Sequence, residues 1–190
     1  MLDEPDRNIL LSVAEDSIRH GLEQGRPLPV TAADYPEALR PQRATFVTLE
    51  RSGELRGCIG SLEAVRPLVE DVAHNAFAAA FSDPRFPPLA TSERADLEVS
   101  ISVLSPPEPM AFESEADLVR QLRPGVDGLI LEEKGRRGTF LPAVWSSLPQ
   151  PHRFFEQLKL KAGLPPDYWS PTVQAARYTT ESFARPFRTG

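Results

Sequence analysis

Cysteine and histidine are scarce in this 190-residue sequence, which contains one cysteine, Cys58, and three histidines. A single cysteine excludes an internal disulfide and any zinc or iron–sulfur site that is built from several thiolates. No two histidines have the spacing of paired metal ligands, such as HxxxH. We therefore predict neither a metal site nor a bound cofactor.

Long hydrophobic runs and an excess of basic charge are also absent. The longest purely apolar run, AFAAAF at 76–81, is far shorter than the roughly 18 residues of a membrane-spanning helix. The net charge of −6 argues against nucleic-acid binding, which needs a basic surface. The first residues, MLDEPDRN, lack the basic segment of a secretory signal, so we expect a cytoplasmic location.

The basic residues that do cluster, Lys134 to Arg137, directly follow two glutamates. This pattern is more typical of a solvated, charged hairpin tip than of a phosphate-binding site. Proline is the residue in excess, with 20 copies. The prolines fall between periodic segments, so they separate the elements of one ordered domain, which we expect to span residues 1–190.

Hydrophobic spacing predicts helices and strands along the whole chain. In the first half we expect helices at 7–24, 31–39 and 67–81, a hairpin at 44–60 and a strand at 97–104. In the second half we expect helices at 114–122 and 152–163, a hairpin at 128–142 and a final strand at 173–183. The helix at 67–81 is predicted to bury Val72, Ala76 and Phe77 against the sheet.

The two expected hairpins share a sequence pattern. LERSGELRGC matches LEEKGRRGT after one deletion, which places Gly57-Cys58 opposite Gly138-Thr139. Each match is followed by a proline and then a helix, which indicates an internal duplication. The sequence therefore predicts an α+β fold with an antiparallel sheet and flanking helices, in which both hairpins join a common sheet. We expect two subdomains, with their boundary at roughly 105–125.

The stretch LRGCIGS at 55–61 surrounds the cysteine. In an extended strand Arg56 and Cys58 share one face, opposite to Gly57, and a neighbouring guanidinium favours a thiolate over a thiol. The missing side chain of Gly60 is expected to leave an opening beside the sulfur.

Three roles for Cys58 remain open, namely a catalytic nucleophile, a ligand-binding thiol and a buried structural residue. A free cysteine often behaves as a small buried hydrophobic residue. A nucleophilic cysteine normally needs a general base. The histidine nearest in sequence, His74, is predicted to lie on the less apolar face of its helix.

A second candidate group lies in NAFAAAFSDPRFPPL at 75–89. Its polar residues Asn75, Asp83 and Arg85 are candidates for binding a substrate or partner. The alternative, which we favour, is an Asp83–Arg85 pair that braces the loop after the helix.

LRGCIGS and NAFAAAFSDPRFPPL resemble the AMME chromosomal-region protein family, whose bacterial and archaeal members are called AmmeMemoRadiSam system protein A. Further matches follow in order at GVDGLIL, GRRGTFLPAVW, FFEQLKLKAGLPPDYW and RYTTESF, so the resemblance covers residues 8–183. It implies an α+β fold with two subdomains around an antiparallel sheet. It also implies two partners, a Memo-type relative of extradiol dioxygenases and a radical S-adenosylmethionine protein.

The resemblance implies that the turn from Arg56 to Ser61, with Gly57 and Gly60, is the functional surface. We therefore expect a component that binds a substrate or a partner protein at this turn around Cys58. The alternative is a thiol-dependent transferase or hydrolase in which Cys58 is the nucleophile and Arg56 stabilises charge.

Overall fold

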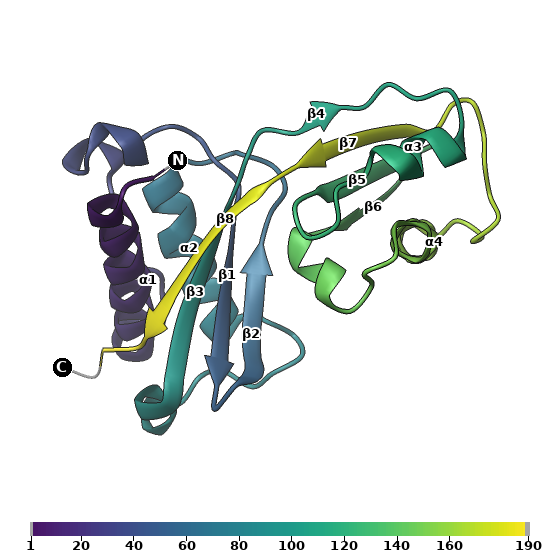
Figure 1. The fold of residues 1–190 in the computed structure, drawn as a ribbon. Coiled ribbons are helices and arrows are strands. Elements are labelled where there is room, and N and C mark those ends of the chain that lie inside the picture. Colours follow the sequence, from purple (N-terminus) through teal and green to yellow (C-terminus); the bar gives the residue numbers. More distant parts are fainter. Residues whose placement is uncertain (1, 189–190) are drawn as a thin grey trace. The chain divides into compact units, whose positions relative to one another are not determined.

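The computed structural model describes residues 2–188, which form two compact units. The first unit consists of residues 2–104 and 181–188, and the second unit of residues 105–180. The chain thus leaves the first unit and returns to it near its C-terminal end (Figure 1). Each unit has a four-stranded sheet and a hydrophobic core of its own.

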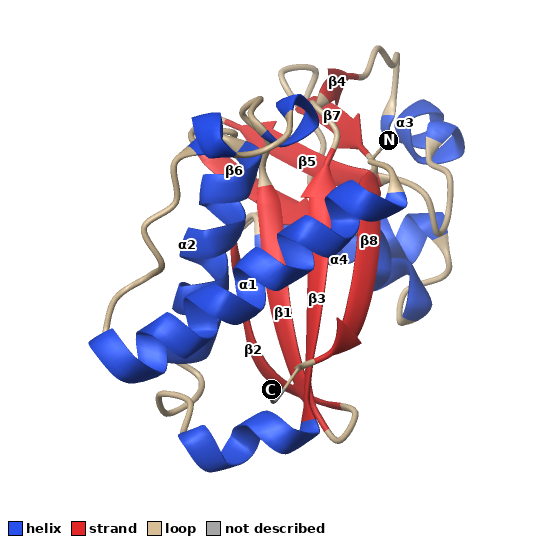
Figure 2. Ribbon diagram, turned by 90° about the vertical axis from the view of Figure 1, so that its left-hand side faces the viewer, coloured by secondary structure: helices blue, strands red, loops and turns tan. Residues whose placement is uncertain are grey.

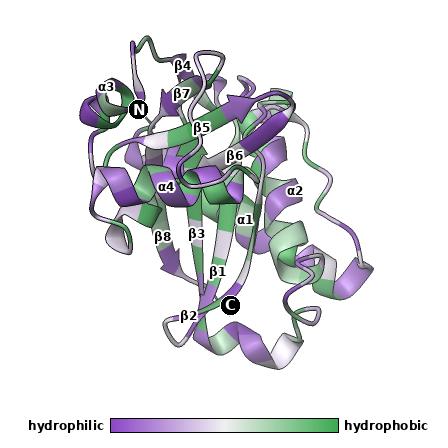
Figure 3. Ribbon diagram, turned by 90° about the vertical axis from the view of Figure 1, so that its right-hand side faces the viewer, coloured by the Kyte–Doolittle hydropathy of each residue, from purple (hydrophilic) through white to green (hydrophobic). Residues whose placement is uncertain are grey.

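The sheet of the first unit has the strand order β2-β1-β3-β8. The strands are β1 (Thr45–Arg51), β2 (Glu54–Gly60), β3 (Leu97–Leu104) and β8 (Thr180–Pro186). Helices α1 (Glu4–Gln24) and α2 (Leu68–Phe81) cover one face of this sheet (Figure 2). Hydrophobic and hydrophilic residues alternate along β1 and β3 (Figure 3), as expected for strands with one face on a core.

The predicted helix at the start of the chain is confirmed. The side chain of Asp3 accepts a hydrogen bond from the amide of Asp6 at its beginning, and Gly25 ends it in a left-handed conformation. The helix predicted at 31–39 is wrong, because this segment forms two short 3-10 turns, Ala32–Asp34 and Glu37–Leu39. Pro36 separates them, since the residue before a proline favours extended backbone.

Helix α2 packs closely on both β1 and α1. Val72 and Ala76 are fully buried in the core, as predicted. Phe77 is only partly buried, and the prediction for it is wrong. Its ring lies 5.0 Å from that of Phe81, and both rings lie against Gly21 of α1. Phe77 therefore packs between the two helices and not against the sheet.

The second unit has the strand order β4-β7-β5-β6. Its strands are β4 (Glu108–Pro109), β5 (Gly128–Glu133), β6 (Arg136–Phe140) and β7 (Gln174–Tyr178), and its helices are α3 (Glu115–Gln121) and α4 (Pro151–Lys161). A 3-10 turn, Pro142–Ser146, carries Trp145, whose ring stacks on Phe154 of α4 at 3.8 Å. Leu118, Leu129 and Leu158 complete the centre of this core.

The two hairpins are built alike. Ser52-Gly53 joins β1 to β2 and Lys134-Gly135 joins β5 to β6, and all four residues have positive φ, which defines a type I′ turn. In the first hairpin the register shifts at one point, so that Arg56 is an extra residue in β2, a β-bulge. The second hairpin is regular, and this difference accounts for the one-residue deletion in the sequence match.

The prediction that both hairpins join a common sheet is wrong. The final segment, predicted as one strand, divides at Thr179 into β7 and β8. Strand β7 pairs with β5 in the second unit, whereas β8 neighbours β3 in the first unit. Each hairpin therefore completes its own sheet, and the α+β class with antiparallel strands is retained.

Candidate functional site

Strand β2, which carries Cys58, lies at an edge of its sheet. Cys58 pairs with Thr48 of β1, and its own amide and carbonyl point away from β1. The amide donates to Asp83 Oδ2 at 2.9 Å, and Arg85 Nη2 donates to the carbonyl at 3.4 Å. The loop after α2 thus supplies hydrogen-bond partners to the backbone of Cys58 at the edge of β2, where a further strand would otherwise pair.

Asp83 and Arg85 form a tight pair in this loop. The Asp83 carboxylate, almost fully buried, accepts from Arg85 Nε at 3.0 Å and from Arg85 Nη2 at 2.7 Å. These hydrogen bonds hold the pKa of Asp83 well below its usual value. Asp83 and Arg85 therefore brace the loop after α2, which was the alternative favoured from the sequence. The same hydrogen bonds fix the positions of both side chains beside Cys58.

The Arg56 side chain forms its hydrogen bonds with groups other than the Cys58 sulfur. The predicted alternation fails at this residue because it forms the bulge. Its side chain is nearly buried, and it donates to Glu93 Oε1 at 2.7 Å and to the Pro87 carbonyl at 3.0 Å. Its hydrogen bond lowers the pKa of Glu93 to about 2. The charge of Arg56 is thus neutralised by a carboxylate that the sequence did not indicate.

Cys58 is half-buried. The hydrogen-bond partner of its sulfur among residues 2–188 is the hydroxyl of Thr48, at 3.3 Å. A threonine hydroxyl is not a general base at neutral pH, and the hydrogen bonds of residues 2–188 place neither a histidine nor a carboxylate on the sulfur. The guanidinium that lies beside Cys58 is that of Arg85, which contacts the Cys58 carbonyl and lies 27 residues further along the chain.

The two glycines beside Cys58 allow close packing. A Cβ on Gly57 would lie 2.1 Å from the carbonyl oxygen of Ala79, so α2 crosses β2 at this point. The prediction that Gly60 leaves an opening beside the sulfur is wrong. A Cβ on Gly60 would lie 2.5 Å from the ring of Phe46, which occupies this space.

Asn75 and Ser61 belong to a different cluster, centred on Thr45 at the start of β1. Asn75 Nδ2 donates to Thr45 Oγ1 and to Asp71 Oδ2, both at 2.9 Å. Thr45 donates to Asp71 at 2.6 Å, and the amide of Ser61 donates to the Thr45 carbonyl. Burial raises the pKa of Asp71. Thr45, Asp71 and Asn75 are buried, and the cluster links the first half of α2 to the residue that follows β2.

The structure therefore brings together only some of the candidate residues. Cys58, Asp83 and Arg85 lie together at the edge of β2, and we call them, with Thr48, the Cys58 surface. Sequence reasoning missed Thr48, Glu93, Thr45 and Asp71. Thr48 and Thr45 were detectable only from the hairpin register, and Asp71 only from its place one turn before Asn75 on α2.

Comparison with known proteins gives consistent matches over both units. The AMMECR1 family model matches residues 11–183. A protein of Methanothermobacter thermautotrophicus is 39% identical over 188 residues, which cover 96% of this chain and 95% of that protein. A protein of Thermococcus gammatolerans is 37% identical over 192 residues, covering 95% and 91%.

A solved structure agrees with the fold. The crystal structure of an uncharacterised protein from Pyrococcus horikoshii matches with a TM-score of 0.83 and 35% sequence identity. The match covers 92% of this chain and 89% of that chain. Within residues 2–188, no helix has both the length and the apolar character that crossing a membrane requires.

Proposed function

Because the chain belongs to the AMMECR1 family, we propose that it is a binding component of an AmmeMemoRadiSam-type system. It holds a partner protein or its substrate at the Cys58 surface, while the redox chemistry belongs to the partners. The partners are a Memo-type relative of extradiol dioxygenases and a radical S-adenosylmethionine protein.

The observation that carries this proposal is the way the loop after α2 presents Arg85 beside Cys58. Asp83 holds the guanidinium through two hydrogen bonds, and yet 54% of the Arg85 side chain is exposed. A fixed, exposed guanidinium next to a half-buried thiol is a preorganised donor, which binds a carboxylate or carbonyl at low entropic cost.

The contacts of Cys58 support binding more than catalysis. Its partner among residues 2–188 is a threonine hydroxyl, and Asp83, the carboxylate at the edge of β2, is committed to a backbone amide and to Arg85. A nucleophilic thiol requires a free base within hydrogen-bond reach. The thiol therefore acts as a contact group in this proposal.

The proposal is tested by measuring binding of the chain to a Memo-type protein and to a radical S-adenosylmethionine protein. Arg85→Gln and Cys58→Ser are compared with Arg26→Gln, which removes the same charge from an exposed arginine after α1. We expect Arg85→Gln to weaken binding to one partner at least tenfold and Arg26→Gln to leave it unchanged.

Alkylation of Cys58 with iodoacetamide gives a second readout, since a carboxamidomethyl group would block the Cys58 surface. Binding that is unaffected by Arg85→Gln and by alkylation would refute the proposal. Turnover of a thioester or other electrophile that is lost in Cys58→Ser would instead establish the nucleophile.

A further inference from the structure

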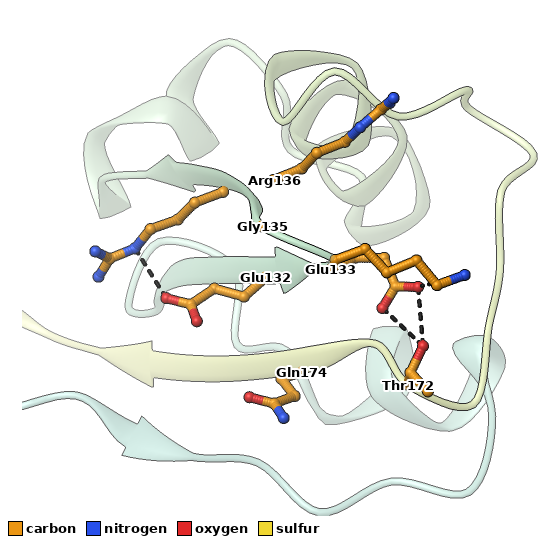
Figure 4. Close-up of a pocket in the computed structure, with 8 residues that line it drawn as sticks. Glu132, Glu133, Gly135, Arg136, Thr172 and Gln174 are labelled. Carbon is orange, nitrogen blue, oxygen red and sulfur yellow. Dashed lines mark hydrogen bonds and ion pairs between the residues drawn. The ribbon is translucent and has the colours of Figure 1, made fainter.

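The charged pocket at the tip of the β5–β6 hairpin is occupied by interactions among its own residues. Its volume is about 330 Å³ (Figure 4). Glu133 accepts from Thr172 Oγ1 at 2.9 Å, and Glu132 lies 3.0 Å from Arg137. The carboxylates of this pocket are therefore already engaged. The feature that is left without a partner lies in the first unit, at one edge of its sheet.

Strand β8 forms the edge of the first sheet that is opposite to β2 (Figure 2). Ser102 Oγ lies 2.8 Å from Ser182 Oγ, and the amide of Phe187 donates to the Leu97 carbonyl at 2.7 Å. Both contacts fit a single antiparallel register between β3 and β8. The register is thus unbroken from residue 182 to residue 187.

This register decides which backbone groups of β8 point away from the sheet. Successive residues of an antiparallel strand direct their N–H and C=O groups alternately to one side and to the other. The backbone of Phe187 points to β3, and so do those of Phe183 and Arg185. The backbones of Ser182 and Ala184 therefore point outward. Both residues are exposed, and the sheet order of the described residues ends at β8.

The two edges of this sheet differ in how they are protected. At β2, Asp83 and Arg85 bind the backbone of Cys58. Edge strands that lack such a cover usually carry charged side chains, bulges or prolines. On β8, the outward residues Ser182 and Ala184 are small and uncharged, and the proline of this strand stands at its last position. The edge of β8 is therefore open to pairing with another strand.

The sequence of β8, TESFARP, is complementary to itself. Antiparallel pairing of two copies about Phe183 places Ser182 opposite Ala184 of the second copy, and Ala184 opposite Ser182 of the second copy. Both residues of each pair face outward, so each pair exchanges both of its N–H···O bonds. Glu181 then faces Arg185, an opposite charge. Both are held in position by ion pairs with α1, so they select the register more than they add attraction.

Pairing through β8 gives a closed assembly. The joined sheet ends at a β2 strand on each side, and the loop after α2 protects that edge at Cys58. A third copy therefore meets a protected edge. The interface uses the same patch on both copies, as in the two-fold symmetric dimers that are the commonest oligomers.

We infer that the edge of β8 is a homodimer interface, at which a second copy of this chain pairs antiparallel about Phe183. Phe183 is the middle residue of Thr180–Pro186, so a two-fold axis at this point uses the whole strand. Because β8 and β2 lie at opposite edges of the sheet, the inference does not depend on the Cys58 surface.

Sedimentation velocity of the full-length protein should show a monomer–dimer equilibrium between about 1 μM and about 1 mM, which spans weak to moderate affinities. Amide hydrogen exchange, measured by NMR in dilute and in concentrated samples, locates the interface. The amides of Ser182 and Ala184 should exchange at least tenfold more slowly in the concentrated sample. The amide of Phe183, which points to β3, should change less.

Substitutions at one position separate pairing from folding. Ala184→Pro removes an outward N–H, and an edge strand tolerates proline where the nitrogen faces solvent. We expect it to weaken dimerisation at least tenfold with an unchanged circular dichroism spectrum. Ala184→Ser is the matched control, because it keeps the amide and a small side chain, and should dimerise like the wild type. Ala184→Lys is a second probe, since an edge lysine opposes strand pairing without removing the amide.

A protein that stays monomeric over this concentration range would overturn the inference. A dimer in which the amides of Ser182 and Ala184 exchange as fast as in the monomer would do so too, as would equal dimerisation of Ala184→Pro and Ala184→Ser. Protection of these amides only after a Memo-type or radical S-adenosylmethionine protein is added would assign the edge to a strand of that protein and not to a second copy.

Discussion

Asp83 joins the end of α2 to the edge of β2 through one buried carboxylate. Replacing it with asparagine removes the charge that Arg85 and the Cys58 amide both contact. Hydrogen bonds to charged groups contribute about 1.5–3 kcal/mol each, so we expect Asp83→Asn to lower the free energy of unfolding by about 2 kcal/mol at pH 7. Urea denaturation measures this difference.

The stabilising effect of the Asp83 carboxylate should also depend on pH. The pKa of Asp83 is lower in the folded state than in the unfolded state. The free energy by which the ionised carboxylate stabilises the fold is therefore fully present above about pH 4, the unfolded pKa. It is lost as pH falls toward the folded-state pKa. The stability difference between wild type and Asp83→Asn should therefore shrink between pH 5 and about pH 2. A constant difference across this range would contradict the assigned role.

The reactivity of Cys58 should depend on Arg85 and not directly on Arg56. A nearby cation favours the reactive thiolate. We expect iodoacetamide to modify the half-buried thiol in the native protein, and Arg85→Gln to slow the modification at pH 7.5. Arg56→Gln should slow it less, because that guanidinium is paired with Glu93. A thiol that reacts only after denaturation would show that Cys58 is a packing residue.

Local residue contacts were predictable where the partners are close in sequence. The Asp83–Arg85 pair follows from its spacing of two residues and the loop around it. The Arg56–Glu93 pair spans 37 residues, and neither residue carries a local signal for the other. The bulge at Arg56 also escaped prediction, because regular alternation was the only available rule for the direction of a strand side chain.

At the scale of elements, the hairpin glycines mark where helices cross the sheets. A Cβ on Gly57 would lie 2.1 Å from a backbone oxygen of α2, whereas a Cβ on Gly138 would meet atoms of Ala162, after α4, at 2.9–3.1 Å. Overpacking costs about 1–3 kcal/mol and sometimes more. We expect Gly57→Ala to destabilise the protein more than Gly138→Ala, as measured by denaturant midpoints.

The helices and strands with strong periodicity were predictable, including α1, α2 and β3. The 3-10 turns around Pro36 were not, since a proline after a short polar segment permits either a helix start or a break. The division of the last strand at Thr179 was also missed. Nothing in its alternating pattern indicates that one part pairs with β5 and the other neighbours β3.

At the scale of the molecule, the C-terminal segment is fixed to the first unit through α1. Glu15, almost fully buried, accepts from Arg185 Nε and Nη2, both at 2.9 Å. Glu15→Gln leaves the Arg185 charge without its partner, which should cost about 2–3 kcal/mol. Hydrogen exchange should accelerate in β1, β3 and β8. Equal acceleration in β5 and β7 would show that the two units unfold together.

The return of the chain to its first sheet sets an order of events during synthesis. Strand β8 neighbours β3, yet the whole second unit lies between them in the sequence. Residues 105–180 therefore leave the ribosome before the strand that completes the earlier sheet. The later part of the polypeptide has all of its strands while the earlier part still exposes the edge of β3. Until β8 emerges, that edge is open to wrong pairing, and so the growing chain is vulnerable to aggregation while residues 105–180 are being made.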